Sequence, residues 1–478
     1  MLALCLSLVC LLILPHLPYH PFQVAPAVLR AHHTDTGNWC RQYIVSLLHP
    51  GTKNEDSSTP KPNVEVTDSS MGDLRHRFLS HDSILHEETA TDFMGKTELG
   101  WEQWNQQSFC HCSEPLRCTP HHHVAFVKVH KAASSTVANI LQRFGYKRGL
   151  NFALPDKRLH SRAANYLSKP GDILTRHSVL PVPKGAHYDI LWNHAVYNLS
   201  AFRDIMPPDT AYITIVREPF QQFVSAFLYY HPEALPPIQA NRSTINETNP
   251  VSDFLYNGAK HNLMSYYRNK QAEDLGMTLH HVTNAILRHQ YIKQLEADFH
   301  LVMITEFFDE SLVLLRRLLR WDVLDILYIP MNTNVKSRPF RFSDADRARH
   351  RLLAPVDYDL YEFFRNRLVN IVKNQSDDFR MEVQQFKNIV LQVQSFCQSS
   401  ASRISLPPMN VSSCSNTSIK VTRMDCHLMT MLELDFLEVL WRRAVSLLPQ
   451  KEQLKRLATA YSRRQHRSRF GHSSGRKH

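Results

Sequence analysis

Residues 126–136 read FVKVHKAASST, and this stretch decides the fold of the chain. Its first residues belong to an apolar run, 124–129, that has the pattern of a short buried strand. Its last residues open the segment 134–144, in which apolar side chains recur at helical spacing. A strand that turns into a helix leaves the unpaired amides of the first helical turn at the edge of the sheet. The stretch therefore predicts an α/β protein with a candidate anion site at this turn.

The rest of the chain repeats the alternation of strand and helix. Three further apolar runs have strand character: 188–192 (YDILW), 211–216 (AYITIV) and 301–305 (LVMIT). Helices are expected over 220–230, directly after Pro219, and over 310–319. Strands separated by helices predict a parallel sheet that is flanked by helices on both faces. Ligands of such sheets bind at the carboxyl ends of the strands.

The first polar cluster at a strand end lies in the opening stretch. His130 and Lys131 stand in the turn, and Ser134, Ser135 and Thr136 begin the helix. A lysine, hydroxyl groups and helix amides can together cradle a phosphate, here without the glycines of a Walker loop. The alternative is a serine-capped helix beside a solvated lysine.

The second polar cluster follows the run 211–216. Arg217 stands at the carboxyl end of this predicted strand, and Ser225 lies two turns into the following helix. Arginine can recognise a phosphate through two parallel hydrogen bonds. The alternative is an ion pair between Arg217 and Glu218 or another nearby carboxylate. Each cluster alone is a weak signal, and the two together are more specific.

Together the clusters resemble the nucleotide-binding elements of Golgi carbohydrate sulfotransferases. More narrowly, the chain is similar to the galactose-3-O-sulfotransferase family, which includes galactosylceramide sulfotransferase. The stretches that carry this similarity are 126–145, 190–194 (ILWNH), 213–230, 299–321 and the region around Cys426. The similarity covers residues 124–445.

This resemblance implies a P-loop-like sulfotransferase fold and 3'-phosphoadenosine-5'-phosphosulfate (PAPS) as the donor, bound without a metal ion. It places His130, Lys131 and His194 in the catalytic centre and leaves open which histidine removes the acceptor proton. The donor-binding positions that it implies are Lys131, Ala133, Ser134, Ser135, Thr136, Arg217 and Ser225. The family loop usually has threonine where this chain has Val129 and Ala132, so we expect weaker or altered donor contacts.

The implied reaction transfers a sulfuryl group to the 3-hydroxyl of a β-galactose on a glycolipid such as galactosylceramide or on a glycoprotein glycan. Two alternatives are a sulfotransferase for a glycosaminoglycan hydroxyl and a catalytically weak, lumenal glycan-binding homologue. The segment 451–478 holds nine Lys or Arg residues and one acid, which accounts for +8 of the net charge of +11. Because the remaining chain is close to neutral, it favours neither a long basic groove nor a nucleic-acid partner.

The N-terminal sequence predicts the compartment. Residues 2–14 form an uninterrupted apolar run of 13 residues, shorter than the roughly 20 that cross a bilayer as a helix. A cleaved signal and a signal-anchor both stay open, and both direct the chain into the secretory lumen. We expect a single-pass type II Golgi membrane protein with a signal-anchor in 1–20, a lumenal stem in 21–120, the catalytic domain in 121–445 and a basic tail in 446–478. Whether it forms a homodimer is left open.

Glycosylation motifs and cysteines agree with a lumenal location. Asn-x-Ser/Thr acceptor motifs occur at Asn198, Asn241, Asn246, Asn374, Asn410 and Asn416. Seven cysteines lie outside the apolar run, and in an oxidising lumen most of them are expected to pair. A Cys/His cluster comprises Cys110, His111, Cys112, Cys118 and His121–His123. Its spacing fits no standard zinc finger, so disulfides beside exposed histidines are favoured and no metal is expected.

Overall fold

The four strands predicted from the sequence form one parallel sheet. The strands are β1 (Val124–Val127), β2 (Ile190–Leu191), β3 (Ala211–Val216) and β4 (Leu301–Ile304), in the spatial order β2-β1-β3-β4. Val124 pairs with Ile190 on one side and with Ala211 on the other, and Ile213 pairs with Leu301. Every residue of these strands is buried, as expected for a parallel sheet covered on both faces. The predicted fold class is confirmed.

The computed structural model describes residues 119–156, 165–168, 172–231, 249–258, 265–330, 340–400, 407–412, 418–454 and 456. All of them lie in the unit Ala90–His478. The expected signal-anchor (1–20), the stem except 119–120, and the basic tail except 446–454 and 456 lie outside the described residues, so the division into four parts stays a prediction. No helix among the described residues is long and apolar enough to cross a membrane.

Three helices follow strands at the predicted places. They are α4 (Ser134–Arg148), α6 (Pro219–Tyr230) and α11 (Phe308–Leu319). Pro219 lies in the first turn of α6, where its missing N–H would have no helical partner in any case. In α4 the predicted apolar face is buried, and Phe144 on this face stacks on Trp321 with ring centroids 3.7 Å apart.

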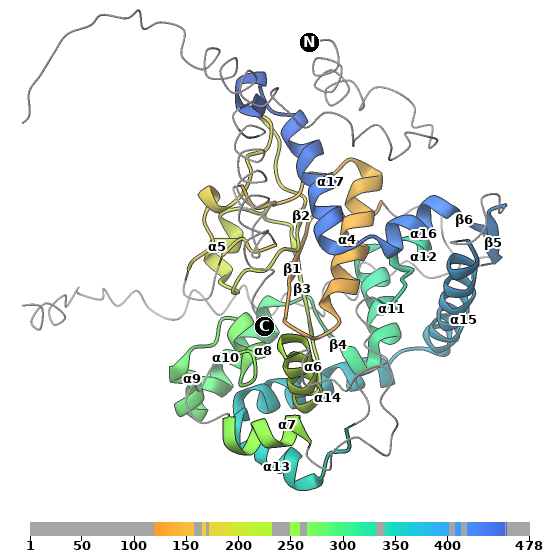
Figure 1. Ribbon diagram of the computed structural model, residues 1–478. Coiled ribbons are helices and arrows are strands. Elements are labelled where there is room, and N and C mark those ends of the chain that lie inside the picture. The colour runs from red at the N-terminus through yellow and green to blue at the C-terminus, as the bar shows by residue number, and fades with distance from the viewer. Residues whose placement is uncertain are drawn as a thin grey trace, which may run out of the picture. The chain divides into compact units, whose positions relative to one another are not determined.

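The remaining helices complete two layers around the sheet. Figure 1 shows α4, α11, α12 (Val323–Ile326), α15 (Asp377–Ser400), α16 (Arg423–Thr430) and α17 (Glu433–Ser446) on one side of the sheet, and α5 (Leu199–Arg203), α8 (Lys270–Asp274), α9 (Leu279–Thr283) and α10 (Ala285–Asp298) on the other. Near α6 lie α7 (Pro250–Asp253), α13 (Asp344–Leu353) and α14 (Pro355–Lys373). A short antiparallel hairpin joins β5 (Met409–Ser412) and β6 (Ser418–Val421).

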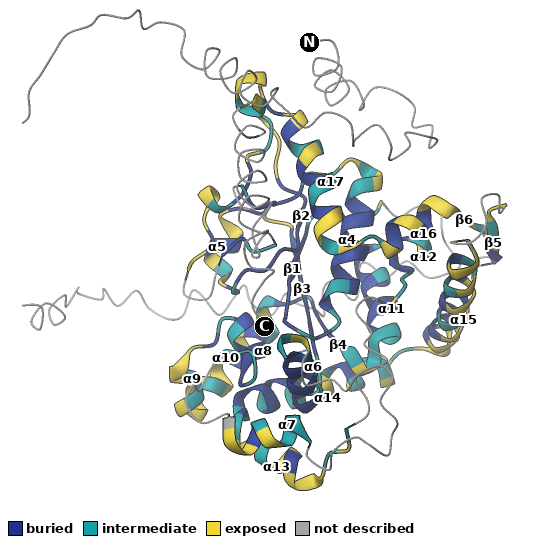
Figure 2. Ribbon diagram, in the orientation of Figure 1, coloured by how far each residue is buried: buried dark blue, intermediate teal, exposed yellow. Residues whose placement is uncertain are grey.

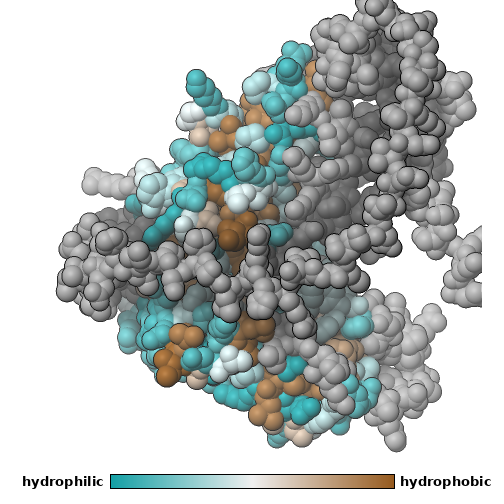
Figure 3. Space-filling view, turned by 90° about the vertical axis from the view of Figure 1, so that its left-hand side faces the viewer, coloured by the Kyte–Doolittle hydropathy of each residue, from teal (hydrophilic) through white to brown (hydrophobic). Residues whose placement is uncertain are grey.

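Burial follows this layered arrangement. In Figure 2 the strands are buried throughout, whereas the outer helices turn one exposed face to solvent. On the described part of the face shown in Figure 3, hydrophobic residues form several patches among hydrophilic ones. The stability of the fold therefore rests on the core around the sheet, where each fully buried large apolar side chain contributes about 1.5–3 kcal/mol.

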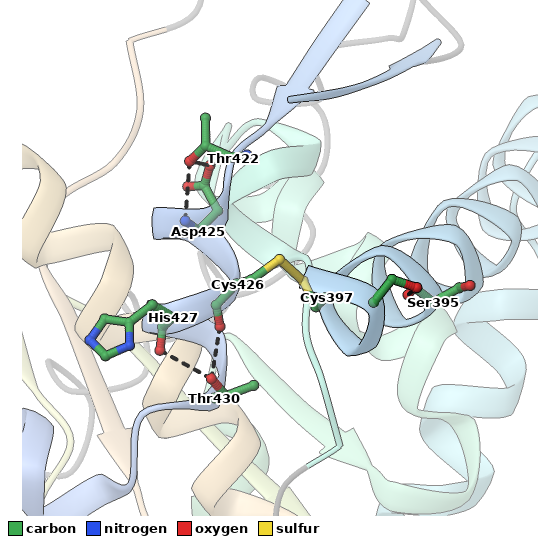
Figure 4. Close-up of a disulfide and its surroundings, with 8 residues drawn as sticks. Ser395, Cys397, Thr422, Asp425, Cys426, His427 and Thr430 are labelled. Carbon is green, nitrogen blue, oxygen red and sulfur yellow. Dashed lines mark hydrogen bonds between the residues drawn. A yellow bond between two sulfur atoms is a disulfide. The ribbon is translucent and has the colours of Figure 1, made fainter. Parts of the chain in front are cut away.

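A disulfide fixes the C-terminal helices of this core. Cys397 near the end of α15 is bonded to Cys426 in α16, 29 residues further on (Figure 4). Asp425 and Thr422 form a capping box at the start of α16. This bond confirms in part the expectation that cysteines pair. The other five cysteines outside the apolar run, Cys40, Cys110, Cys112, Cys118 and Cys414, lie outside the described residues.

Candidate active site

The turn between β1 and α4 is held in an unusual backbone conformation. Lys131 and Ala133 have φ angles of 61° and 59°, in the left-handed region that favours glycine. Such residues are typical of functional turns, where the surrounding structure offsets a cost of about 1–3 kcal/mol each. The turn thus adopts, with non-glycine residues, the left-handed backbone conformation for which Walker-type loops use glycine.

Hydrogen bonds from both sides brace this turn. The hydroxyl of Ser134 donates to the carbonyl of Val129 (2.6 Å), and that of Thr305 donates to the carbonyl of Ala132 (3.1 Å). The side chain of Ser134 is buried and stabilises the loop. Its contribution to an anion site would be its backbone amide, which belongs to the first turn of α4. Val129 and Ala132 are fully buried in the core. The departure from the family loop therefore falls on packing positions.

Positive charges gather around the turn. The ammonium of Lys131 lies 3.9 Å from the ring centroid of Tyr229, and the guanidinium of Arg217 donates to the carbonyl of Lys131 (3.2 Å). The pKa of Lys131 is lowered to about 8, chiefly by burial and then by the neighbouring charges of Arg217 and Lys128. Because burial and the neighbouring positive charges destabilise the protonated form of Lys131, a bound anion would be stabilised at this site.

The second predicted cluster joins the first at this place. The backbone of Arg217 exchanges two hydrogen bonds of 2.8 Å with the side-chain amide of Gln271. The carboxylate of Glu218, the partner considered for Arg217 in the alternative, accepts hydrogen bonds from the amides of Phe220 and Gln221 at the start of α6. Ser225 is partly buried in α6. The structure thus brings Arg217 and Lys131 together as expected.

His130 is fixed at both ring nitrogens. Its Nδ1 donates to Oδ2 of Asp274 (2.7 Å), and the same oxygen accepts the backbone N–H of His130 (2.8 Å). Its Nε2 accepts from the hydroxyl of Tyr166 (2.7 Å). The carbonyl of His130 accepts from the side chain of Gln222 (3.2 Å). Because the carboxylate of Asp274 accepts a hydrogen bond from Nδ1, the neutral ring carries its proton on Nδ1, and the lone pair of Nε2 is able to accept a proton.

Asp274 is an ionised carboxylate inside the protein. Burial raises its pKa, but the charges of His130 and Lys270 outweigh this effect and bring the pKa below its usual value. The ammonium of Lys270, itself buried, lies 3.0 Å from Oδ1 of Asp274. Asp274 therefore bridges the ammonium of Lys270 and the Nδ1 of His130 through its two carboxylate oxygens.

His194 lies against His130. The two rings stack with centroids 4.1 Å apart and an interplanar angle of 22°, and Tyr166 stacks on the ring of His194 with centroids 4.8 Å apart. The Nδ1 of His194 donates to the carbonyl of Lys128 (3.1 Å). Burial, together with the charges of His130, Lys128 and Lys270, holds the pKa of His194 well below its usual value. His194 is therefore neutral, with its proton on Nδ1.

Glu433, at the first turn of α17, reaches the same region from the C-terminal part of the chain. Its carboxylate forms an ion pair with the buried Lys128 and accepts from the side chains of Asn165 (2.7 Å) and Ser135 (3.0 Å). Burial raises the pKa of Glu433, but Lys128 and these hydrogen bonds outweigh it and lower the pKa. Thus the hydroxyl of Ser135 is held by a hydrogen bond to the carboxylate of Glu433.

Sequence reasoning had placed His130, Lys131, His194 and Arg217 at the site, and the structure brings these four together. It missed Asp274, Lys270, Tyr166 and Glu433, each of which is far away in sequence. Asp274 lies 144 residues after His130 and occurs in a short helix without apolar periodicity. Only the acidic and basic spacing of Lys270 and Asp274, one helical turn apart, could have served as a signal.

A parallel sheet with a cationic strand–helix turn and an Asp–His pair at its carboxyl edge defines an α/β protein with a candidate anion site. The chain belongs to the galactose-3-O-sulfotransferase family, whose model matches residues 93–405. This confirms the resemblance seen in the sequence.

Three relatives illustrate the relationship. Galactosylceramide sulfotransferase of Mus musculus is 34% identical over 250 residues, which are 52% of this chain and 57% of the relative. Galactose-3-O-sulfotransferase 3 of Homo sapiens is 35% identical over 268 residues, 55% of this chain and 60% of the relative. Galactose-3-O-sulfotransferase 2 of Homo sapiens is 35% identical over 250 residues, 51% of this chain and 60% of the relative. The chain thus spans less than two thirds of the length of these relatives.

Proposed function

We propose that this protein transfers the sulfuryl group of PAPS to the 3-hydroxyl of a β-galactose on a glycolipid or a glycoprotein glycan. The observation that carries the proposal is the position of His130: its ring is held by Asp274, and it directly precedes Lys131, whose carbonyl accepts from Arg217. A proton acceptor beside an anion site is what sulfuryl transfer to a hydroxyl requires.

The donor would bind across the β1–α4 turn and the start of α6. Lys131 and the amides of Ala133, Ser134 and Ser135 face the 5'-phosphosulfate, while the amide of Thr136 donates to the carbonyl of Ala133 (3.0 Å) and braces the turn. Arg217 with Ser225 takes the 3'-phosphate. As the bond between sulfur and the bridging oxygen breaks, negative charge develops on the leaving phosphate. Lys131 and the amino end of α4 stabilise that charge. These groups bring the positive charge that the reaction needs, in line with the expectation that PAPS binds without a metal ion.

His130 is the proposed base. The acceptor 3-hydroxyl loses its proton to Nε2 of His130 as its oxygen forms the new bond to sulfur, and Asp274 stabilises the resulting imidazolium. The hydroxyl of Tyr166, which donates to Nε2 of His130 in this structure, occupies the position that the acceptor hydroxyl would take. His194 is a poor base because its pKa is held low; it is proposed to orient the ring of His130 by stacking.

The compartment is part of the proposal. We place the chain in the Golgi membrane as a single-pass type II protein with a lumenal catalytic domain. The disulfide between Cys397 and Cys426 supports an oxidising compartment. Asn198, Asn374 and Asn410, three of the six acceptor asparagines, are exposed on the described surface, which glycosylation requires. The other three, Asn241, Asn246 and Asn416, lie outside the described residues.

The test is transfer of radiolabelled sulfate from PAPS to a panel of acceptors by the purified chain. The panel contains galactosylceramide, a glycan with terminal β-galactose, the same glycan with 3-deoxygalactose, and a glycosaminoglycan. Label is expected on one or both galactose acceptors and on none that lacks the 3-hydroxyl. Transfer to the glycosaminoglycan alone, or equal transfer to the 3-deoxy acceptor, would contradict the proposal. The His130→Ala variant is the matched inactive control.

A further inference from the structure

A second cluster of histidine and carboxylate side chains lies at the opposite edge of the sheet. His123 immediately precedes β1, and His187 and Asp189 precede β2. Because parallel strands share one direction, this amino edge is separated from His130 and Lys131 by the length of β1. The cluster therefore has no part in the proposed sulfuryl transfer, and any ligand that it binds is independent of that reaction.

Three ligand-type atoms of the cluster converge. The Nε2 atoms of His123 and His187 lie 3.0 Å apart, and Oδ1 of Asp189 lies 3.5 Å from the first and 3.2 Å from the second. Zinc binds imidazole nitrogen and carboxylate oxygen at about 2.0–2.2 Å in a tetrahedron, which separates the ligand atoms by about 3.3 Å. The three atoms are thus already spaced as one face of such a tetrahedron.

The residues behind these atoms are also those of a metal site. The Nδ1 of His123 donates to Oδ1 of Asp209 (2.7 Å), so that Nε2 is the nitrogen left for a ligand bond. The other oxygen of Asp189, Oδ2, accepts the backbone amide of Asn151 (2.6 Å), which fixes the carboxylate. A carboxylate behind a ligating histidine and a hydrogen bond behind a ligating carboxylate are the usual supports of zinc ligands.

We infer that His123, His187 and Asp189 bind a zinc ion, with Asp209 orienting His123 and the fourth position open to solvent. Two imidazoles and one carboxylate favour zinc over magnesium or calcium, which prefer oxygen ligands alone. The side chain of His187 is 59% exposed, so the ion can enter from solvent, whereas Asp189 is only 9% exposed. The ion would clamp the starts of β1 and β2.

His123 also belongs to the Cys/His segment 110–123, for which the sequence favoured no metal, and Cys110, His111, Cys112 and Cys118 of that segment lie outside the described residues. Without a metal, the approaches of His187 Nε2 to His123 Nε2 (3.0 Å) and to Asp189 Oδ1 (3.2 Å) are contacts between the side chains themselves. That arrangement is a hydrogen-bond network rather than a metal site, and it predicts no metal uptake. Cobalt distinguishes the two, since tetrahedral cobalt has an intense visible spectrum and cobalt–thiolate bonds add a separate near-ultraviolet band.

The experiment uses the full chain without a histidine tag, freed of metal by chelating resin and titrated with zinc or cobalt. One equivalent is expected to bind per chain, with a tetrahedral cobalt spectrum that lacks the thiolate band, and zinc is expected to raise Tm. His187→Ala should lose this equivalent and the Tm increase. His177→Ala removes another exposed histidine and is the matched control, which should bind as the unaltered chain does.

Three results would overturn the inference. They are no uptake by the unaltered chain, equal uptake and spectra in the His187→Ala variant, and a spectrum dominated by thiolate ligands. His187→Ala is suited to this test because its exposed side chain can be removed without leaving a cavity in the core. Sulfate transfer by this variant should equal that of the unaltered chain, which separates the metal site from the active site.

Discussion

The two edges of the sheet carry the same residue types in opposite electrostatic settings. At the carboxyl edge, the buried His130 has Asp274 as its acid partner and stacks on His194, which feels the charges of Lys128 and Lys270. Lys131 follows His130 in the turn and is contacted by Arg217. At the amino edge, His123 lies between the carboxylates of Asp189 and Asp209 and beside an exposed histidine. We therefore propose an anionic ligand for the first edge and a cation for the second.

The difference shows that an imidazole takes its role from its neighbours. Both His130 and His123 donate Nδ1 to an aspartate and present Nε2. Next to a cationic turn, that Nε2 is the proposed base for a hydroxyl. Next to a second imidazole and a carboxylate, the same Nε2 is the proposed metal ligand. Four predictions test this contrast, from the largest effect to the smallest.

The largest effect is expected from His130→Ala. Loss of the proposed base should reduce turnover at least about 100-fold, the lower limit for general acid–base groups. Donor affinity should stay within a few-fold because the base acts only in the chemical step. Single-turnover rates and calorimetry with the 3'-phosphorylated nucleotide measure the two quantities. Asp274→Asn should lower turnover as well. The acid limb of the pH–rate profile of this variant should shift, and a purely structural role of Asp274 would not cause such a shift.

His187→Ala is the control at the other edge and should keep full turnover. If His130→Ala folded normally and kept its rate, the site would have to be rebuilt around His194. If both variants lost activity equally, the two edges would not be separate in function.

The second effect concerns donor affinity. Arg217→Ala should weaken binding of the donor nucleotide by about 2–5 kcal/mol, the usual cost of truncating one partner of a buried charge pair. Acceptor affinity should change little because Arg217 lies on the donor side. Calorimetry on the variant gives the affinity directly. Arg203→Ala removes an exposed arginine elsewhere and serves as the matched control. Unchanged nucleotide affinity in folded Arg217→Ala would show that the 3'-phosphate binds elsewhere.

The sequence was sufficient for the framework and for half of the site. The apolar runs at 124–129, 211–216 and 301–305 predicted three strands almost to the residue, because fully buried parallel strands are uniformly apolar. The strand predicted over 188–192 is reduced to Ile190–Leu191, although the carbonyl of Asp189 still accepts the amide of Val124 in β1 (2.8 Å).

What the sequence could not predict depends on contacts between distant segments. Asp274 reaches His130 only because α8 packs near the carboxyl edge, and Glu433 reaches Lys128 across 305 residues. Likewise, nothing local indicates that Asp209 and Asp189 meet at His123. Local patterns identify a residue that ends a strand, but the partner that sets its pKa or tautomer comes from the tertiary fold.

A third, smaller effect is expected from Asp357, which holds α8 and thus Asp274 in place. Its Oδ1 accepts the amide of Ala272 (2.8 Å). Its pKa is raised to about 7, chiefly by burial and also by the charge of Asp274, against backbone hydrogen bonds that lower it. The folded pKa lies above the unfolded value of about 3.9. Its stabilising contribution is therefore complete below pH 4 and is lost as the pH rises through 7.

Between pH 5 and 7 this loss amounts to about 2 kcal/mol, on the scale of about 1.4 kcal/mol per pKa unit. Asp357→Asn cannot ionise, so its stability should fall less over the same range, while the amide oxygen still accepts from Ala272. Denaturant unfolding at several pH values measures this difference. Parallel pH curves for the two proteins would mean that Asp357 does not ionise in this range.

The smallest effect is expected from the titration of Lys131. In the free protein its pKa is lowered to about 8, chiefly by burial and then by Arg217 and Lys128. A bound phosphosulfate adds an opposite charge and raises this pKa, so donor binding takes up a proton as the pH rises past 8. Donor affinity should therefore be nearly constant below pH 7 and fall by about tenfold between pH 7 and 9, in proportion to the protonated fraction of Lys131. Lys131→Arg stays charged over this range and should show a flat profile, which separates the titration of the lysine from a general loss of stability at high pH. If the affinity of Lys131→Arg fell with pH as much as that of the unaltered chain, a group other than Lys131 would be titrating. The carboxyl edge would then not be distinguished from the amino edge by a titrating lysine.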